Sequence, residues 1–129
     1  MKYQPLVKKA QAAKLHSYSP YSNFRVGAAV LTSSGKVFTG CNIENSSISL
    51  TVCAERTALF KALSEGNYKF EAIAIASDAE EFIPPCGACR QVMMEFGADI
   101  DVVLTNSKGK TKILKMATLL PYPFTGKFL

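Results

Sequence analysis

The segment from Phe70 to Gly97, FEAIAIASDAEEFIPPCGACRQVMMEFG, decides the fold. Its first eight residues are mostly apolar and alternate as a β-strand does. Residues 78–85 begin with Asp78, end in two prolines and predict a loop. The stretch from Cys86 to Phe96 predicts a helix that Gly97 ends. A strand that leads through a loop into a helix is typical of α/β domains.

The rest of the chain extends this pattern in both directions. Apolar spacing and turn residues predict helices at 6–15 and 51–64 and strands at 24–31, 36–44, 102–105 and 111–114. Thr51 is a suitable N-cap for the second helix. Residues 106–109 are too few for a crossover, so the last two strands are expected to form an antiparallel hairpin. We therefore predict one α/β domain over residues 1–129, a three-layer α/β/α arrangement around a five-stranded mixed sheet.

Composition and charge exclude several classes of protein. The 129 residues suit one domain, and 48% hydrophobic against 19% charged residues excludes disorder. No apolar stretch is long enough to span a bilayer, and four lysines fall where a signal peptide would be apolar, so a cytoplasmic protein without membrane contact is expected. The net charge is +5, but Lys108, Lys110 and Lys112 lack interleaved aromatic residues. No nucleic-acid partner is therefore expected.

Three of the four cysteines occur at the starts of two predicted helices. Cys53 lies in the first turn of one, and Cys86 and Cys89 lie three apart at the start of the other. Helix N-termini stabilise thiolates, and converging thiolates favour zinc. Four cysteines are too few for a disulfide scaffold, which agrees with a reducing cytosol. The one histidine, His16, is remote in sequence and an improbable ligand.

The fourth ligand position decides between two kinds of zinc site. Three protein ligands leave a place for a catalytic water molecule, whereas four make a closed structural site. Cys41 is the only further thiol, and its distance of twelve residues from Cys53 is unlike the close pairs of structural sites. We favour a free, packed Cys41, with a four-cysteine structural module as the alternative.

Charged residues beside the cysteines suggest catalysis. Glu55 follows Cys53 by two positions and could reach the water as a general acid and base, although a first-turn glutamate is also common in ordinary helices. Three thiolates around Zn²⁺ carry a net charge of −1, which a neighbouring cation would offset. Arg56 is placed for that role, Arg90 is a weaker candidate, and a surface position is the alternative for Arg56.

Substrate-binding candidates precede this cluster. Asn42 and Glu44 lie two apart on a predicted strand, so their side chains leave the same face. An amide beside a carboxylate suits sugar hydroxyl groups, while the carboxylate would repel a phosphate, which favours a nucleoside over a nucleotide or polynucleotide. Phe24 could lie against a pyrimidine ring, and core packing explains it equally well.

Longer runs give a family resemblance. Cys53-Ala54-Glu55 with Pro85-Cys86-Gly87-Ala88-Cys89 matches the zinc deaminase signature in its three-cysteine form. From about Tyr18 to Phe124 the chain resembles the small homotetrameric cytidine deaminases of nucleoside salvage. The matching runs are Ser19-Pro20-Tyr21-Ser22, Val26-Gly27-Ala28-Ala29, Gly40-Cys41-Asn42-Ile43-Glu44-Asn45, Cys53-Ala54-Glu55-Arg56-Thr57-Ala58 and Pro85-Cys86-Gly87-Ala88-Cys89-Arg90-Gln91, with Phe24 between the first two.

The resemblance implies a role for each matched residue. Cys53, Cys86 and Cys89 would bind one Zn²⁺ per subunit, Glu55 would carry protons, and Arg56 would temper the thiolate charge. Asn42 and Glu44 would hold the ribose, Phe24 would pack on the base, and the backbone of Ala54 would contact it. Phe124 is a candidate to reach the site of a neighbouring subunit. The family often has Tyr where Ile48 stands and Ser where Pro84 stands.

The function implied is hydrolytic deamination of cytidine and deoxycytidine to the uracil nucleosides and ammonia. Deaminases of RNA or DNA are an alternative, but they commonly carry His at the position of Cys53 and join their last strands by a crossover. A deaminase of another aminopyrimidine nucleoside, such as blasticidin S, is a further alternative. The Asn42-Ile43-Glu44-Asn45 run favours cytidine by resemblance.

Overall fold

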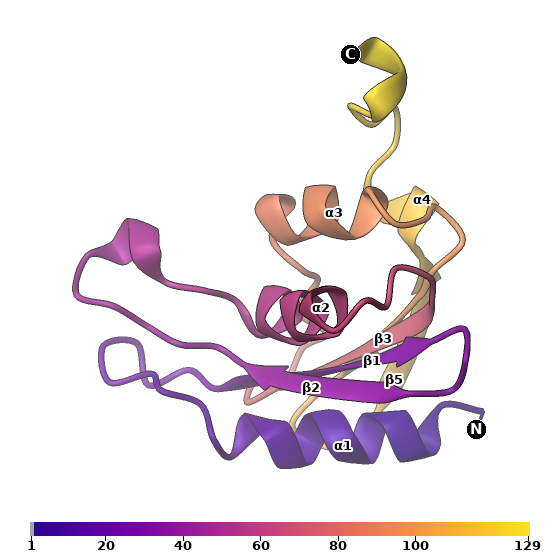
Figure 1. Cartoon of the computed structure of the whole chain (residues 1–129). Coiled ribbons are helices and arrows are strands. Elements are labelled where there is room, and N and C mark those ends of the chain that lie inside the picture. Colours follow the sequence, from indigo (N-terminus) through magenta and orange to yellow (C-terminus); the bar gives the residue numbers. More distant parts are fainter. Residues whose placement is uncertain (1) are drawn as a thin grey trace.

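The computed structural model, which describes residues 2–129, has a five-stranded sheet at its centre (Figure 1). The strands are β1 Val26–Thr32, β2 Val37–Cys41, β3 Phe70–Ser77, β4 Asp101–Thr105 and β5 Thr111–Lys115. The α-helices are α1 Gln4–Lys14, α2 Ala54–Ser64, α3 Gly87–Met94 and α4 Met116–Leu119, and the 3₁₀ helices are η1 Ile48–Leu50 and η2 Gly126–Phe128. The helix α1 lies along one face of the sheet, and α2 and α3 lie on the other side.

The strand order is β2-β1-β3-β4-β5. The pair β3 and β4 is parallel, and the other three neighbouring pairs are antiparallel. The predicted five-stranded mixed sheet is therefore confirmed. Because β3 and β4 run parallel, the chain between them must cross from one end of the sheet to the other, and α3 lies within that crossover.

Alternation along β3 divides the core between the two faces. Ile73 and Ile75 pack in the larger cluster with residues of α2 and α3. Ala72, Ala74 and Ala76 pack against α1 in the smaller cluster. Alanines let α1 approach the sheet closely, and a Cβ built on Gly27 of β1 would lie 2.1 Å from the carbonyl oxygen of Ala10. Small side chains on this face therefore fix the position of α1.

Gly40 has the same effect on the opposite side of the sheet. A Cβ at this position would lie 2.5 Å from the backbone nitrogen of Ala58 and 3.0 Å from the carbonyl oxygen of Ala54. The backbone of α2 therefore rests directly on β2. This contact holds the N-terminus of α2, where Cys53 and Glu55 lie, close to the sheet.

Several predicted boundaries are wrong. The helix expected from Thr51 begins at Ala54 with Cys53 as N-cap, because Val52 instead exchanges backbone hydrogen bonds with Ile43 at 3.0 and 2.9 Å. The strand expected to reach Glu44 ends at Cys41. The short helices α4 and η2, which fall in the C-terminal tail at residues 116–129, are absent from the sequence-based prediction. No helix within residues 2–129 combines the length and hydropathy needed to cross a membrane.

Candidate active site

Three thiols converge where α2 and α3 begin. Cys53 is the N-cap of α2, Cys86 is the N-cap of α3, and Cys89 lies in the first turn of α3. Their sulfur atoms all lie within 4.8 Å of one another, and the Sγ atoms of Cys53 and Cys86 are 3.7 Å apart. The structure thus brings together all three cysteines that the sequence analysis selected as ligands.

The electrostatic environment stabilises the Cys53 thiolate. Its pKa is lowered to about 5, mainly by the hydrogen bond from the Cys89 thiol and further by Arg56 and Cys86. The pKa of Cys89 is raised, because this thiol donates to Cys53 and is buried. Arg56 Nη2 donates to Cys53 Sγ at 3.6 Å. A positive charge therefore lies directly beside the sulfur cluster, where the sequence analysis placed it.

The thiol cluster fits a zinc ion. Two sulfurs bound to one tetrahedral zinc lie roughly 3.8 Å apart, which is the spacing of Cys53 and Cys86. Arg56 Nε is buried and has no hydrogen-bond partner among the described residues, so this cation near the thiols keeps a buried donor that is not satisfied within the chain. Cys41 lies outside the group of candidate ligands formed within residues 2–129. The four-cysteine structural module is therefore not supported.

Glu55 lies in the first turn of α2, two residues after Cys53, and is 5% exposed. Its pKa is raised to about 7, chiefly because burial disfavours the charged carboxylate, and the charge of Cys53 adds to the shift. The helix backbone and Arg56 act in the opposite direction. A carboxyl that titrates near neutral pH can both accept and release a proton during a reaction.

A pocket of about 300 Å³ opens next to Glu55. The predicted residues Phe24, Asn42, Glu44, Cys53, Ala54, Glu55 and Cys86 all line it. So does Pro84, which directly precedes Pro85 and Cys86. One cavity therefore contains two of the three candidate metal ligands together with the candidate proton-transfer and substrate-binding residues, while the third ligand, Cys89, is buried behind its wall.

Glu44 and Asn42 are held by the loop before β1. The Glu44 carboxylate accepts hydrogen bonds from the backbone N–H groups of Tyr21 and Ser22 at 2.9 and 3.2 Å, and the Ser22 hydroxyl donates to its other oxygen. These contacts, led by the Ser22 hydroxyl, lower the pKa of Glu44. Asn42 donates from Nδ2 to the Phe24 carbonyl at 2.8 Å.

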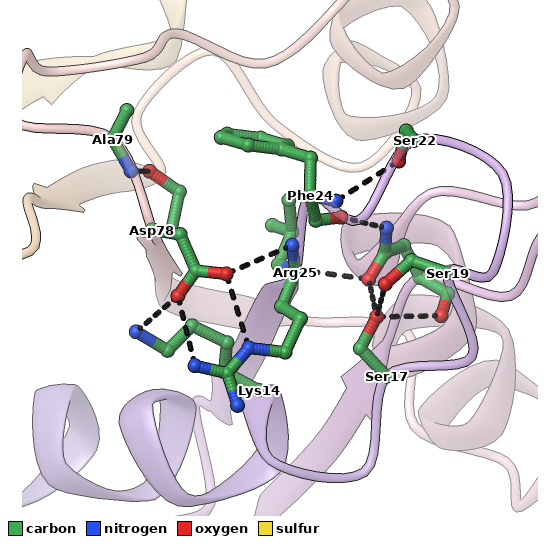
Figure 2. Close-up of polar contacts among 11 residues, drawn as sticks. Lys14, Ser17, Ser19, Ser22, Phe24, Arg25, Asp78 and Ala79 are labelled. Carbon is green, nitrogen blue, oxygen red and sulfur yellow. Dashed lines mark hydrogen bonds and ion pairs between the residues drawn. The ribbon is translucent and has the colours of Figure 1, made fainter.

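The oxygen of the Asn42 amide is occupied within the chain. Oδ1 accepts from the Ser17 hydroxyl at 2.5 Å and from the Val26 backbone N–H at 3.0 Å. Figure 2 shows the hydroxyl groups of Ser17 and Ser19 turned toward each other, with Ser22 next to the backbone of Phe24. Asn42 therefore faces the pocket with one N–H of Nδ2 free of these contacts, which makes it a hydrogen-bond donor to a ligand.

Sequence reasoning missed part of the pocket wall. The further lining residues are Ser22, Val26, Thr51, Ile75, Ser77, Ile83 and Thr105. Thr105 and Ser77 are buried at the ends of β4 and β3, and Thr105 Oγ1 has no hydrogen-bond partner among the described residues. Only the parallel pairing of β3 and β4 brings these strand ends together. No short motif could have indicated it.

The candidate Phe124, and Ile48 at the position where the resembled family often has Tyr, lie away from the pocket of their own chain. Phe124 is 59% exposed, stacks on Phe128 with ring centroids 5.7 Å apart and is not part of the pocket lining. Ile48 is 84% exposed on η1 and lines a shallow hollow that shares Ser22, Glu44 and Thr51 with the pocket. Arg90, the weaker candidate for the cation beside the thiols, instead donates to two backbone carbonyls, those of Pro85 and Leu119.

Comparison with known proteins assigns the site to a family. The model of the cytidine and deoxycytidylate deaminase zinc-binding region matches residues 1–105. The chain is 48% identical to the cytidine deaminase of Sporosarcina psychrophila over 126 residues, which cover 97% of this chain and 93% of that protein. It is 51% identical to the cytidine deaminase of Halalkalibacterium halodurans over 128 residues, 98% and 97% of the two chains.

The fold agrees with solved structures of the same family. The cytidine deaminase of Burkholderia pseudomallei superposes with a TM-score of 0.92 at 50% identity and covers 96% of this chain and 100% of its own. The zinc-binding region of the family and the three-thiol group together make this a zinc site with one ion per chain. The chain belongs to the family of cytidine and deoxycytidylate deaminases.

Proposed function

We propose that the chain hydrolyses the 4-amino group of cytidine and deoxycytidine, giving uridine and deoxyuridine plus ammonia. The observation that carries this proposal is the pocket lined by buried Glu55, by Cys53 and Cys86 of the three-thiol group, and by the polar residues Asn42 and Glu44. Two relatives that are about 50% identical to this chain over nearly their whole length are named cytidine deaminases, which supports the same substrate.

The proposed reaction depends on metal held by Cys53, Cys86 and Cys89. Zinc held there would supply a Lewis acid that lowers the pKa of a water molecule. Glu55 would take one proton from the attacking water molecule and deliver it to N3 of the pyrimidine, while the water oxygen bonds to C4. Glu55 would then carry the remaining proton from the hydroxyl group on C4 to the amino group, so that the C4–N bond breaks, ammonia leaves and C4 becomes a carbonyl.

The environment of Glu55 supports this exchange of protons. Its pKa of about 7 allows both the charged and the neutral form at working pH. Arg56 beside Cys53 would offset the excess charge of three thiolates on a divalent ion. Both effects come from residues within three positions of the Cys53 ligand.

The sugar of the substrate is proposed to bind where Asn42 and Glu44 line the pocket. Asn42 would donate its free N–H to a sugar hydroxyl, and the Glu44 carboxylate would accept from one. A carboxylate here disfavours a 5′-phosphate, which supports a nucleoside as substrate. Phe24 would pack on the base, and the backbone of Ala54 at the start of α2 would contact its polar edge.

We further propose a homotetramer that acts in the cytoplasm in pyrimidine nucleoside salvage. Exposed apolar residues support assembly. They lie in the tail and on the arm, the segment between β2 and α2 that carries η1, and include Ile48, Leu50 and Phe128. Phe124 lies outside its own pocket, so its proposed contribution is to the site of a neighbouring subunit.

The experiment is the ultraviolet absorbance of cytidine incubated with purified protein. The proposal expects loss of the cytosine band, release of ammonia in equal amount, arrest by a zinc chelator and recovery on addition of Zn²⁺. Guanosine is the matched control and should remain unchanged. A zinc-loaded chain that leaves cytidine intact would contradict the proposed function.

A further inference from the structure

The segment that leads into α3 can form few backbone hydrogen bonds of its own. Residues 81–85 include Pro84 and Pro85, which have no backbone N–H to donate. The preceding loop is anchored by Ser107 N–H, which donates to the Ala79 carbonyl at 2.8 Å, and by Asn106, which donates to the Glu80 carbonyl at 2.9 Å. These anchors stop before the pocket-lining residues Ile83 and Pro84.

Arg90 supplies the anchor at the other end of this segment. Its Nε donates to the Pro85 carbonyl at 2.7 Å, and its Nη1 donates to the Leu119 carbonyl at 2.9 Å. Pro85 is buried and directly precedes the thiol of Cys86, whereas Leu119 is the last residue of α4. One guanidinium therefore ties the backbone before a candidate metal ligand to the segment that follows β5.

We propose that Arg90 is a positioning residue, which holds the Cys86 thiol and the pocket rim at Pro84 by fixing the Pro85 carbonyl to α4. The proposal rests on the zinc site of the proposed function. In this proposal Arg90 acts through hydrogen bonds to two backbone carbonyls. It does not act through the charge compensation that its place after Cys89 suggested. Arg56, which donates to Cys53 Sγ at 3.6 Å, already provides the neighbouring charge.

The chemistry of the side chain explains why an arginine stands here. Its planar group offers several N–H donors in fixed directions, so Nε and Nη1 can bind two carbonyls at once. Lysine carries a single ammonium group on a flexible stem, and it would retain one contact at most in a good geometry. Methionine keeps much of the length and the apolar stem but makes neither hydrogen bond.

Gln91 provides a matched control from the same turn of α3. Its Nε2 donates to the Phe124 carbonyl at 2.9 Å, so it also contacts the tail. It makes no hydrogen bond to the Pro84–Cys86 segment among the described residues. Removing its amide tests loss of a tail contact without loss of the anchor at Pro85.

The test measures zinc affinity by competition with a chromogenic chelator for the wild type, R90M, R90K and Q91L. Groups that orient metal ligands typically contribute about 10- to 100-fold to affinity. R90M is therefore expected to bind zinc at least about tenfold more weakly, and R90K should fall between R90M and the wild type. Q91L should stay within about twofold of the wild type. Circular dichroism of each metal-free variant checks that the fold is kept.

Equal zinc affinity of R90M and the wild type would overturn the role of Arg90 and leave the proposed function intact. An equal loss in Q91L would also overturn it, because the effect would then come from the tail alone. If R90M does not fold, R90K decides the question, and unchanged zinc affinity in R90K contradicts the proposal. A wild-type chain that binds no zinc would instead overturn the proposed function.

Discussion

Glu55 shows at the residue scale how burial prepares a side chain for chemistry. The carboxyl is 5% exposed, and this burial raises its pKa to about 7. The sequence could indicate the residue through its spacing from Cys53, but it could not indicate the depth of burial, which depends on the packing of α2 against the sheet. The proposed role as proton carrier therefore gains its physical basis from the fold.

Ser22 is a residue that the sequence analysis did not select as functional, and its hydroxyl holds the Glu44 carboxylate. Replacing Ser22 by Ala removes this contact and should weaken ribose binding by about 1 kcal/mol, the net worth of one hydrogen bond. We expect KM for cytidine to rise about fivefold with kcat nearly unchanged, because ground state and transition state lose the same contact. Steady-state kinetics measures both constants.

The matched control for this variant is Ser19→Ala. Ser19 lies in the same loop, but its hydroxyl contacts Ser17 rather than Glu44. We expect KM within about twofold of the wild type for this control. A Ser22→Ala enzyme with the KM of the wild type would show that Glu44 does not depend on this hydroxyl.

At the scale of elements, two helix starts explain why distant cysteines meet. Cys53 and Cys86 are both N-caps, and the contact of α2 with β2 at Gly40 fixes one of these helix starts against the sheet. Local patterns predicted both helices, because spacing and turn residues act over a few positions. The start of α2 was predicted three residues too early, because the pairing of Val52 with Ile43 is a longer-range contact.

Asp78 joins three elements at one point. Its carboxylate lies 3.0 Å from Lys14 Nζ at the end of α1 and 3.0 Å from Arg25 Nε just before β1, and it follows β3 (Figure 2). The hydrogen bond from Arg25, with further help from Lys14, lowers its pKa to about 2. Asp78→Asn should therefore destabilise the fold by about 1 kcal/mol at pH 7, after allowance for solvent screening.

The effect of Asp78→Asn should depend on pH. A lowered folded-state pKa gives stability that is present above the unfolded value near 4 and is lost as pH falls through about 2. Urea unfolding of the metal-free proteins should give a higher free energy of unfolding for the wild type than for the variant near neutral pH, and this difference should disappear at acid pH. The exposed Glu65, which forms no ion pair within the described residues, serves as the control as Glu65→Gln. A difference in the free energy of unfolding that stays constant with pH would contradict this explanation.

For the whole molecule, the sequence predicted the class of fold better than its topology. The number of strands and the mixed character of the sheet follow from local patterns and connection lengths. The order β2-β1-β3-β4-β5 does not, since several orders satisfy the same patterns. The pocket wall at Ser77 and Thr105 depends on that order and so was not predicted. The tail helices α4 and η2 are too short to give a periodic signal.

Assembly is tested at this same scale. The arm that carries η1 projects from the body of the subunit (Figure 1), and Ile48 on it is 84% exposed. Sedimentation equilibrium should give a species of about 56 kDa, four chains of 14.0 kDa. Ile48→Asp should shift the distribution towards smaller species, because a charge in an apolar interface is costly. Tyr68→Asp, at another exposed position, should leave it unchanged. A wild-type chain that sediments as a monomer would contradict the proposed tetramer.

The proposed division of labour between three thiolates that hold zinc and one carboxyl that moves protons is tested most directly by Glu55→Gln. The amide has nearly the same size but cannot carry a proton at neutral pH. Zinc content and turnover of cytidine are measured on the same preparation of this variant. We predict one zinc ion per chain, as in the wild type, and a kcat lowered by about a hundredfold or more. Turnover close to that of the wild type at full zinc content would contradict the account.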